Sequence, residues 1–280
     1  MASTLFLPGP LVLLGAGKMG GAMLRGWLAA GADARRIFVV DPALPADAAA
    51  EVQAAGATVN PGAAVLADLA PQVLVLAVKP QTLADAVLPL RPFMATSAAT
   101  GPLVVSIAAG KTVADIAAAL GEGPIVRAMP NTPASVGRGI TAAFAGAGVD
   151  AAQRALAGDL LAAVGGVVWL DDEDLMDAVT AVSGSGPAYV FLLAECLAAA
   201  AREMGLPDGL AARLARDTVA GAGELLHQAS EPASVLRENV TSPGGTTAAA
   251  LAVLMGHEGL KPLLARAVRA ARDRARELAG

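Results

Sequence analysis

The feature that most constrains the fold of this chain is a series of short aliphatic runs without polar alternation. They lie within segments 11–14, 36–41, 72–80, 101–110 and 123–133, with further strands expected at 139–144 and 166–169. A strand with one face in water alternates polar and apolar residues, whereas a strand buried on both faces is aliphatic throughout. Segments with helical spacing lie between the runs, at 45–55, 82–90, 112–120 and 150–164. This alternation predicts a doubly wound, mostly parallel sheet with helices on both faces.

The pattern changes near residue 171. From there the chain has long helical stretches and no isolated β-like run; the stretches are 187–204, 208–228, 246–255 and 258–278. We therefore expect an α/β protein with two domains, a mostly parallel sheet domain over residues 1–170 and an all-helical domain over residues 171–280.

The composition favours a soluble chain that associates with itself. Apolar residues make up 55% of the chain and charged residues 16%, so apolar surface should remain once the core is filled. Such surface on a soluble protein usually meets a partner subunit, and we expect a homodimer formed through residues 175–275. The net charge is −5 without a basic block, which argues against a nucleic-acid partner.

The cysteine content and the uncharged stretches bear on compartment and membrane. The single cysteine, Cys196, lies in an apolar helical stretch, where we expect it to be buried. It allows no disulfide and no cysteine–histidine metal site, so no metal is expected and a reducing cytoplasm fits. The uncharged stretches 92–110, 178–194 and 239–256 contain Gly, Pro or Ser clusters that would break a lipid-spanning helix. We therefore expect no membrane span and no targeting segment.

The first aliphatic run leads into a glycine loop, GAGKMG, at residues 15–20. This spacing between a buried strand and a helix is typical of dinucleotide binding; a tight turn without a ligand is the alternative. Gly15 would allow the turn, Gly17 the approach of a pyrophosphate, and Gly20 the packing of the helix on the strand. The N–H groups and dipole at the helix start would hold the phosphates. We expect the cofactor to be bound by Gly15, Ala16, Gly17, Lys18, Met19 and Gly20.

Asp41 ends the second predicted strand. An acidic side chain about twenty residues beyond such a loop commonly binds the adenine ribose hydroxyls. Its charge would also repel the 2′-phosphate of NADPH, and Arg35 and Arg36 lie before the strand, where a phosphate is harder to reach. This local physics favours NADH, while a turn aspartate before Pro42 is the alternative.

Two further segments follow the fourth and sixth predicted strands, AVKPQ at 77–81 and RAMPNTP at 127–133. Ligands bind beyond the carboxyl ends of strands in such sheets. We therefore place on the nicotinamide side of the site the residues Ala77, Val78, Lys79, Pro80, Asn131 and Thr132.

Two expected helix starts in the second half are rich in Ser, Thr, Gly and Pro. In AVSGSGPAYVFLLAE (181–195), serines precede Pro187, which is typical of a capped helix. In VTSPGGTTAAALAVL (240–254), Gly244 and Gly245 leave the backbone bare and two threonines follow. Exposed N–H groups at a helix start bind a carboxylate or a similar anion. Because a dinucleotide would fill the first glycine loop, this second one can hold the other reactant.

These segments resemble the motifs of the pyrroline-5-carboxylate reductase family, in the same order and over essentially the whole chain. The C-terminal segments AVSGSGPAYVFLLAE, TVAGAGELL and LRENVTSPGGTTAAALAVL are the most specific, beside GAGKMG, AVKPQ and RAMPNTP. The resemblance implies a Rossmann-like domain, then a helical domain that dimerises, with dimers often building decamers. It implies reduction of 1-pyrroline-5-carboxylate to L-proline with NADPH or NADH, the last step of proline biosynthesis. The family more often uses NADPH, and Asp41 departs from the small or basic residues expected there.

The resemblance also assigns residues to the substrate: Ser183, Glu231, Asn239, Ser242, Gly244, Gly245, Thr246 and Thr247. It implies that Ser242 and the amides of Gly245 and Thr246 hold the substrate carboxylate. Thr247 would be the catalytic residue, with its hydroxyl directed at the ring nitrogen.

Two other functions stay open from the residues alone. Another two-domain dehydrogenase, acting on a β-hydroxyacid, would want a lysine in the helices between residues 170 and 230, where this chain has none. A non-catalytic, nucleotide-sensing dimer is the other possibility. Consumption of reduced cofactor with pyrroline-5-carboxylate separates the three.

Overall fold

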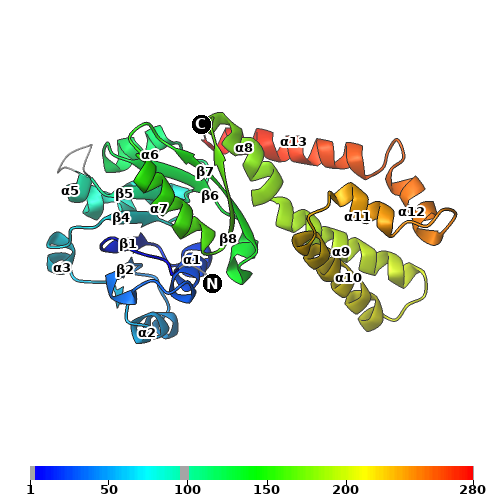
Figure 1. The fold of residues 1–280 in the computed structure, drawn as a ribbon, viewed down its shortest axis with the longest axis horizontal. Helices are drawn as coiled ribbons and strands as arrows, with labels where there is room; N and C mark the ends of the chain where they lie inside the picture. Colours follow the sequence, from blue (N-terminus) through cyan, green and yellow to red (C-terminus); the bar gives the residue numbers. More distant parts are fainter. Residues whose placement is uncertain (1–3, 95–100, 280) are drawn as a thin grey trace. The chain divides into compact units, whose positions relative to one another are not determined.

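The computed structural model describes residues 4–94 and 101–279, and the chain forms two compact units (Figure 1). The first runs to Gly184 and takes in residues 274–280, and the second is Ser185–Asp273. This division falls later than the boundary that the change of pattern predicts after residue 170, because Met176 and Ala181 are fully buried. The domain boundary itself stays a prediction.

The first unit is built on one sheet, which has eight strands within the described residues. The order is β3-β2-β1-β4-β5-β6-β7-β8; all neighbours are parallel except β6 and β7, which pair antiparallel. The strands are β1 (Leu11–Leu14), β2 (Ile37–Val40), β3 (Thr58–Val59), β4 (Val73–Leu76), β5 (Leu103–Ser106), β6 (Ile125–Met129), β7 (Gly139–Ala145) and β8 (Gly165–Leu170). The mostly parallel, Rossmann-like sheet is thus confirmed.

Helices cover this sheet on both faces. They are α1 (Lys18–Ala29), α2 (Ala46–Ala54), α3 (Ala63–Ala67), α4 (Leu83–Ala86), α5 (Arg91–Met94), α6 (Val113–Leu120), α7 (Ala151–Ala162) and α8 (Met176–Val179). Side chains that alternate along β1 enter separate cores. Leu11 and Leu13 pack in the core that contains Trp27 of α1 and Leu160 of α7. Val12 and Leu14 pack in the core on the other face, with α4 and α6. The strand lacks polar alternation because both of its faces are buried, as expected.

The second unit is helical, as expected. It contains α9 (Gly186–Glu203), α10 (Asp208–Gln228), α11 (Ala233–Asn239), α12 (Thr246–Leu254) and most of α13 (Leu260–Ala279). The sequence pattern misses α11, of seven residues, and β3, of two. Both are too short for the spacing of apolar residues to reveal a period.

The Gly, Pro and Ser residues of 178–194 do not break the helix, so that expectation is wrong. A continuous helical run, Glu173–Glu203, passes through a π-helical turn at Thr180–Gly184. Among the described residues it is the one helix long and apolar enough to cross a membrane by length and composition, with a mean hydropathy of 1.3. Such a helix is also what a partner subunit would cover.

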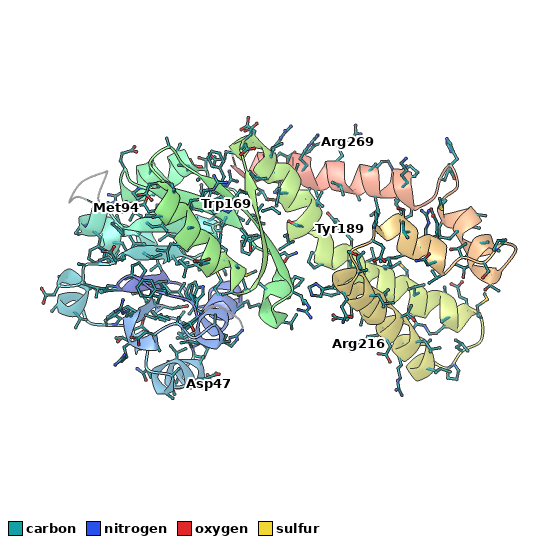
Figure 2. The ribbon with its side chains drawn as sticks, in the orientation of Figure 1. Asp47, Met94, Trp169, Tyr189, Arg216 and Arg269 are labelled. Atoms are coloured by element: carbon teal, nitrogen blue, oxygen red, sulfur yellow. The ribbon has the colours of Figure 1, made fainter. Side chains whose placement is uncertain are left out.

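Apolar side chains are widely exposed on the second unit. They include Phe191 at 63%, Leu225 at 67% and Val253 at 77% exposure. Cys196 is exposed as well, so the expectation of a buried cysteine is wrong for the single chain. Figure 2 shows Tyr189 and Arg216 on the two long helices α9 and α10, which pack against each other. A unit of this size cannot bury all faces of such helices within itself.

Candidate active site

The glycine loop, Asp41 and Ala77 come together at one edge of the sheet. Strands β1, β2 and β4 are adjacent and parallel, so their carboxyl ends meet there. The Gly15 N–H donates to the Val40 carbonyl at 2.9 Å, and the Ala77 N–H donates to the Leu14 carbonyl at 2.8 Å. From β1 the chain continues to β2 on one side, and from β4 it continues to β5 on the other, so the strand order reverses between β1 and β4, which is where such folds bind ligands.

Two of the three glycines of the loop are required for steric reasons. Gly15 has a φ of +88°, and a Cβ there would lie 2.7 Å from the Ala77 carbonyl oxygen. A Cβ on Gly20 would collide with the carbonyl oxygen of Gly15. A Cβ on Gly17, in contrast, would meet no atom within 4 Å. Gly15 and Gly20 are therefore required by the fold, whereas Gly17 leaves open space that a ligand can use.

The start of α1 fits a phosphate group. Gly17 is the N-cap, no side chain caps the helix, and its first turn has no acidic residue. The first helical bond runs from the Gly21 N–H to the Gly17 carbonyl, so the N–H groups of Lys18, Met19 and Gly20 precede it. Together with the helix dipole, these groups form an anion site. The residues present thus fit the pyrophosphate of a dinucleotide.

Asp41 contacts the glycine loop directly. Its Oδ2 accepts the Ala16 N–H at 2.8 Å, and its Oδ1 accepts the Ala43 N–H at 3.0 Å. The Ala16 amide, which the sequence analysis assigns to the cofactor, is therefore already bonded to Asp41. The carboxylate fixes the loop whether or not it also binds a ribose.

Asn60 was not foreseen as part of this site. Its side chain pairs with the main chain of Asp41 in both directions: its Oδ1 accepts the Asp41 N–H at 2.8 Å, and its Nδ2 donates to the Asp41 carbonyl at 2.9 Å. The two residues are 19 positions apart. No local sequence pattern predicts that these two residues pair. The one available signal is an Asn that follows a short strand.

The arginines before β2 are held away from this edge. Arg35 pairs with Asp33 at 2.9 Å, and its hydrogen bonds lower the pKa of the Asp33 carboxyl. Arg36 donates to the Leu7 carbonyl. Both residues lie in the turn that precedes β2, whereas Asp41 follows its end.

The segments after β4 and β6 reach the same edge. Lys79 is exposed, and its carbonyl accepts from Thr82 as a 3-10 turn begins at Pro80. Ala77 and Val78 are partly buried beside Gly15. Thr132 is exposed and starts another 3-10 turn.

Asn131 is buried, and its side chain bonds to backbone. Its Oδ1 accepts the Ile140 N–H at 2.9 Å, and its Nδ2 donates to the Ser183 carbonyl at 3.1 Å. That carbonyl would ordinarily accept from the residue four positions later, which is Pro187 and has no N–H. Asn131 thus satisfies the group that the proline leaves without an intrahelical partner. It ties the end of β6 to the helical run.

The serine-rich start expected before Pro187 is not a free helix end. Ser185 has helical backbone angles and makes no side-chain cap. The Ser183 hydroxyl donates to the Val179 carbonyl at 3.1 Å. Ser183 thus lies in the π-helical turn, partly buried, rather than at an exposed helix start.

The loop at 241–247 does form a bare helix start. Gly244 has a φ of +72°, and Gly245 is the N-cap of α12 without a side-chain cap. The Gly245 N–H donates to the Ser242 carbonyl at 3.1 Å, which closes the turn. The first helical bond runs from Ala249 to Gly245. The amides that precede it, and so have no intrahelical acceptor, are those of Thr246, Thr247 and Ala248.

The remaining predicted substrate residues lie near this loop in the chain. Asn239 ends α11 and is exposed, and Glu231 is exposed before that helix. Thr241 donates to the Arg237 carbonyl, which fixes the entry to the loop. Within the second unit, a groove lined by Thr241, Ala248 and residues of α11 and α12 adjoins the loop.

A partly buried ion pair joins β6 to the residues that follow β8. Arg127 of β6 contacts Glu173 at 2.9 Å, and Glu173 also accepts the Val113 N–H at the start of α6. At the same helix start, the backbone N–H of Thr112 donates to Asp115 and lowers the pKa of that carboxyl. Sequence reasoning did not find this pair, because its partners are 46 residues apart.

Both halves of the chain resemble known protein families. Residues 173–278 match the family model of pyrroline-5-carboxylate reductase dimerisation, and residues 10–110 match that of NADP oxidoreductase, coenzyme F420-dependent. Pyrroline-5-carboxylate reductase of Haemophilus influenzae is 39% identical over 245 residues, which cover 87% of this chain and 88% of that protein. This chain belongs to the pyrroline-5-carboxylate reductase family.

Solved structures agree. The reductase of Coxiella burnetii has a TM-score of 0.88 and 36% identity, covering 98% of this chain and 100% of that one. The Plasmodium falciparum reductase with NADP bound has a TM-score of 0.78 and 27% identity, covering 98% and 99%. Other curated reductases match over less than half of their length, 46% in two of them.

The different roles of Gly17 and Gly20 can be tested by substitution. We expect Gly17→Ala to fold like the parent, because its Cβ meets open space, but to weaken dinucleotide binding about tenfold, or 1.4 kcal/mol. Gly20→Ala should instead lower the melting temperature, because its Cβ collides with the Gly15 carbonyl. Calorimetric titration and thermal unfolding measure the two effects. Equal binding by Gly17→Ala and the parent would contradict the assigned phosphate site.

The hydrogen bonds of Asn131 can be tested through the stability of the protein. We expect Asn131→Ala to lower the free energy of unfolding by about 1–3 kcal/mol, because the Ser183 carbonyl loses its donor. The neighbouring exposed residue supplies the control: Thr132→Ala should change it by no more than about 0.5 kcal/mol. Urea unfolding followed by circular dichroism measures both. Equal effects of the two variants would contradict the role of Asn131.

Proposed function

We propose that this protein reduces 1-pyrroline-5-carboxylate to L-proline with NADPH or NADH. The main support for the proposal is the start of α12, which has no side-chain cap. In addition, 87% of this chain aligns with a pyrroline-5-carboxylate reductase at 39% identity. The chain would thereby have two anion sites built from backbone, one for each reactant. The bare helix start is the feature that distinguishes it from a protein that only senses a nucleotide.

The substrate carboxylate would bind at the start of α12. The N–H groups of Thr246, Thr247 and Ala248 have no intrahelical acceptor, and the helix dipole favours a negative charge there. The Gly245 amide closes the turn onto Ser242 instead, so in this proposal it shapes the loop. The exposed Ser242 hydroxyl remains free to donate to the same carboxylate.

Thr247 would position the reacting ring. Its side chain is partly buried on the first turn of α12, and its hydroxyl would hydrogen-bond the ring nitrogen. The imine is basic enough to arrive partly protonated, so the hydroxyl has to orient it and need not supply the proton. Positioning of this kind lowers barriers by as much as about 7–11 kcal/mol. When bound, the reduced nicotinamide supplies the hydride that goes to the C=N carbon.

The other predicted residues would hold the cofactor and line the substrate site. Lys18, Met19 and Gly20 would bind the pyrophosphate through their amides, and Gly17 would admit it. Ala77 to Pro80 and Thr132 would lie beside the nicotinamide. Asn131 would contribute indirectly, because its side chain holds the Ser183 carbonyl and the Ile140 N–H in place. Ser183, Glu231 and Asn239 would line the substrate side.

The catalytic assignment is tested with two threonine variants. We expect Thr247→Ala to lower turnover at least about tenfold, or 1.4 kcal/mol, because the ring nitrogen loses its hydrogen-bond partner. Thr247→Ser keeps the hydroxyl and should retain most of the activity. Reduced-cofactor absorbance with pyrroline-5-carboxylate measures turnover, and calorimetric titration should give an unchanged affinity for the cofactor. Full turnover by Thr247→Ala would remove this residue from the mechanism.

The protein would work as a homodimer formed by its helical unit. The large exposed apolar side chains of α9 and α10, together with the match to a dimerisation model over residues 173–278, support this. Dimers would assemble further into decamers, and the protein would act in the cytoplasm without membrane or nucleic-acid partners.

Two phenylalanines test the dimer. Phe191 on α9 and Phe6 in the first unit are exposed to similar extents, 63% and 73%. We expect Phe191→Glu to shift the mass in light scattering at micromolar concentration toward the 27.6 kDa of one chain, because the charge opposes burial. Phe6→Glu should leave the parent mass unchanged. A monomeric parent protein would contradict the proposal.

A further inference from the structure

Four hydrogen bonds hold Asp41 in one position. Two of them run from the amides of Ala16 and Ala43 to its carboxylate oxygens, at 2.8 and 3.0 Å. The other two join its main chain to the Asn60 side chain, at 2.8 and 2.9 Å. The carboxylate cannot turn away from the glycine loop without losing bonds to both amides. Its negative charge is therefore fixed beside the loop.

The backbone of Asn60 places its side chain beside Asp41. It follows β3, and its N–H donates to the Val39 carbonyl at 2.7 Å. Its φ of +46° lies in the left-handed region, which Asn tolerates better than most residues. In this conformation the side-chain amide of Asn60 hydrogen-bonds both the N–H and the carbonyl of Asp41. The side chain thus extends the pairing of β2 beyond the short β3.

Acidic residues outnumber basic residues in the segment that contains Asp41. Residues 37–78 contain no Lys or Arg but four acidic residues, Asp41, Asp47, Glu51 and Asp68. Arg35 and Arg36 precede β2 and bond to Asp33 and Leu7. Lys18 and Lys79 flank the edge, but both are exposed, and no described residue bonds to the ammonium group of either.

We infer that this enzyme selects NADH over NADPH, with Asp41 as the residue that determines specificity and Asn60 as the residue that positions it. Each carboxylate oxygen accepts one N–H, so lone pairs remain for the adenine ribose hydroxyls. A 2′-phosphate would bring a charge of about −2 against this fixed carboxylate. The inference rests on the proposed function only for the identity of the site as a dinucleotide site.

Binding without substrate tests the inference. Calorimetric titrations with NAD⁺ and NADP⁺ give the ratio of the two dissociation constants, and we expect NADP⁺ to bind at least about tenfold more weakly to the parent. Asp41→Asn removes the charge and keeps an oxygen acceptor, so it should lower this ratio at least about fivefold. Asn60→Gly removes the clamp without opposing the positive φ, so it should lower the ratio about threefold.

Asp47→Asn is the matched control. Asp47 is exposed on α2 (Figure 2), and the substitution makes the same change of charge; it should leave the ratio unchanged. Should Asp41→Asn fold poorly by thermal unfolding, Asp41→Glu decides, because it keeps the charge and should keep the preference for NAD⁺. Equal or tighter NADP⁺ binding by the parent, an equal effect of Asp47→Asn, or an unchanged ratio in Asn60→Gly would overturn the inference.

Turnover separates this inference from the proposed function. Discrimination between NAD⁺ and NADP⁺ without reduction of pyrroline-5-carboxylate would leave Asp41 in its role and remove the reaction. Reduction of pyrroline-5-carboxylate with equal affinity for both cofactors would keep the reaction and remove Asp41 as the determinant of specificity.

Discussion

The burial of a parallel sheet on both faces is the constraint on which the rest of the first unit depends. Leu11 and Leu13 face one core while Val12 and Leu14 face the other, so β1 has no face in water. The glycine loop, Asp41 and Ala77 follow the carboxyl ends of the parallel neighbours β1, β2 and β4. Within the same unit, Arg127 pairs with Glu173 and Asn131 bonds to the Ser183 carbonyl.

Backbone amides, rather than ionisable side chains, would be the recognition groups of the proposed site. The starts of α1 and α12 each have a glycine N-cap and no side-chain cap. A capping side chain would satisfy the same amides that an anion needs. In the proposed reaction the cofactor would supply the hydride, so a site with few acids or bases would be sufficient. The protein itself would orient the two reactants, and the charge of Asp41 would favour NADH over NADPH.

The sequence predicted the features that depend on local pattern. Continuous aliphatic runs gave the sheet, and the spacing of Gly15, Gly17 and Gly20 gave the loop. Features that depend on distant partners were missed: the Asn60 pairing with Asp41, the Asn131 bond to Ser183 and the Arg127–Glu173 ion pair. The helix through Pro187 was missed because its unpaired carbonyl is satisfied by a residue 52 positions earlier. Cys196 was placed in a core because sequence cannot tell a buried helix face from one that a partner covers.

The central claim is that two bare helix starts hold the two reactants, and a crystal structure of the protein with NADH and L-proline tests it most directly. We expect the pyrophosphate against Gly17 and the amides of Lys18 to Gly20, and the proline carboxylate against the amides of Thr246 to Ala248. A proline carboxylate bound by side chains elsewhere, with the start of α12 in contact only with solvent, would contradict it.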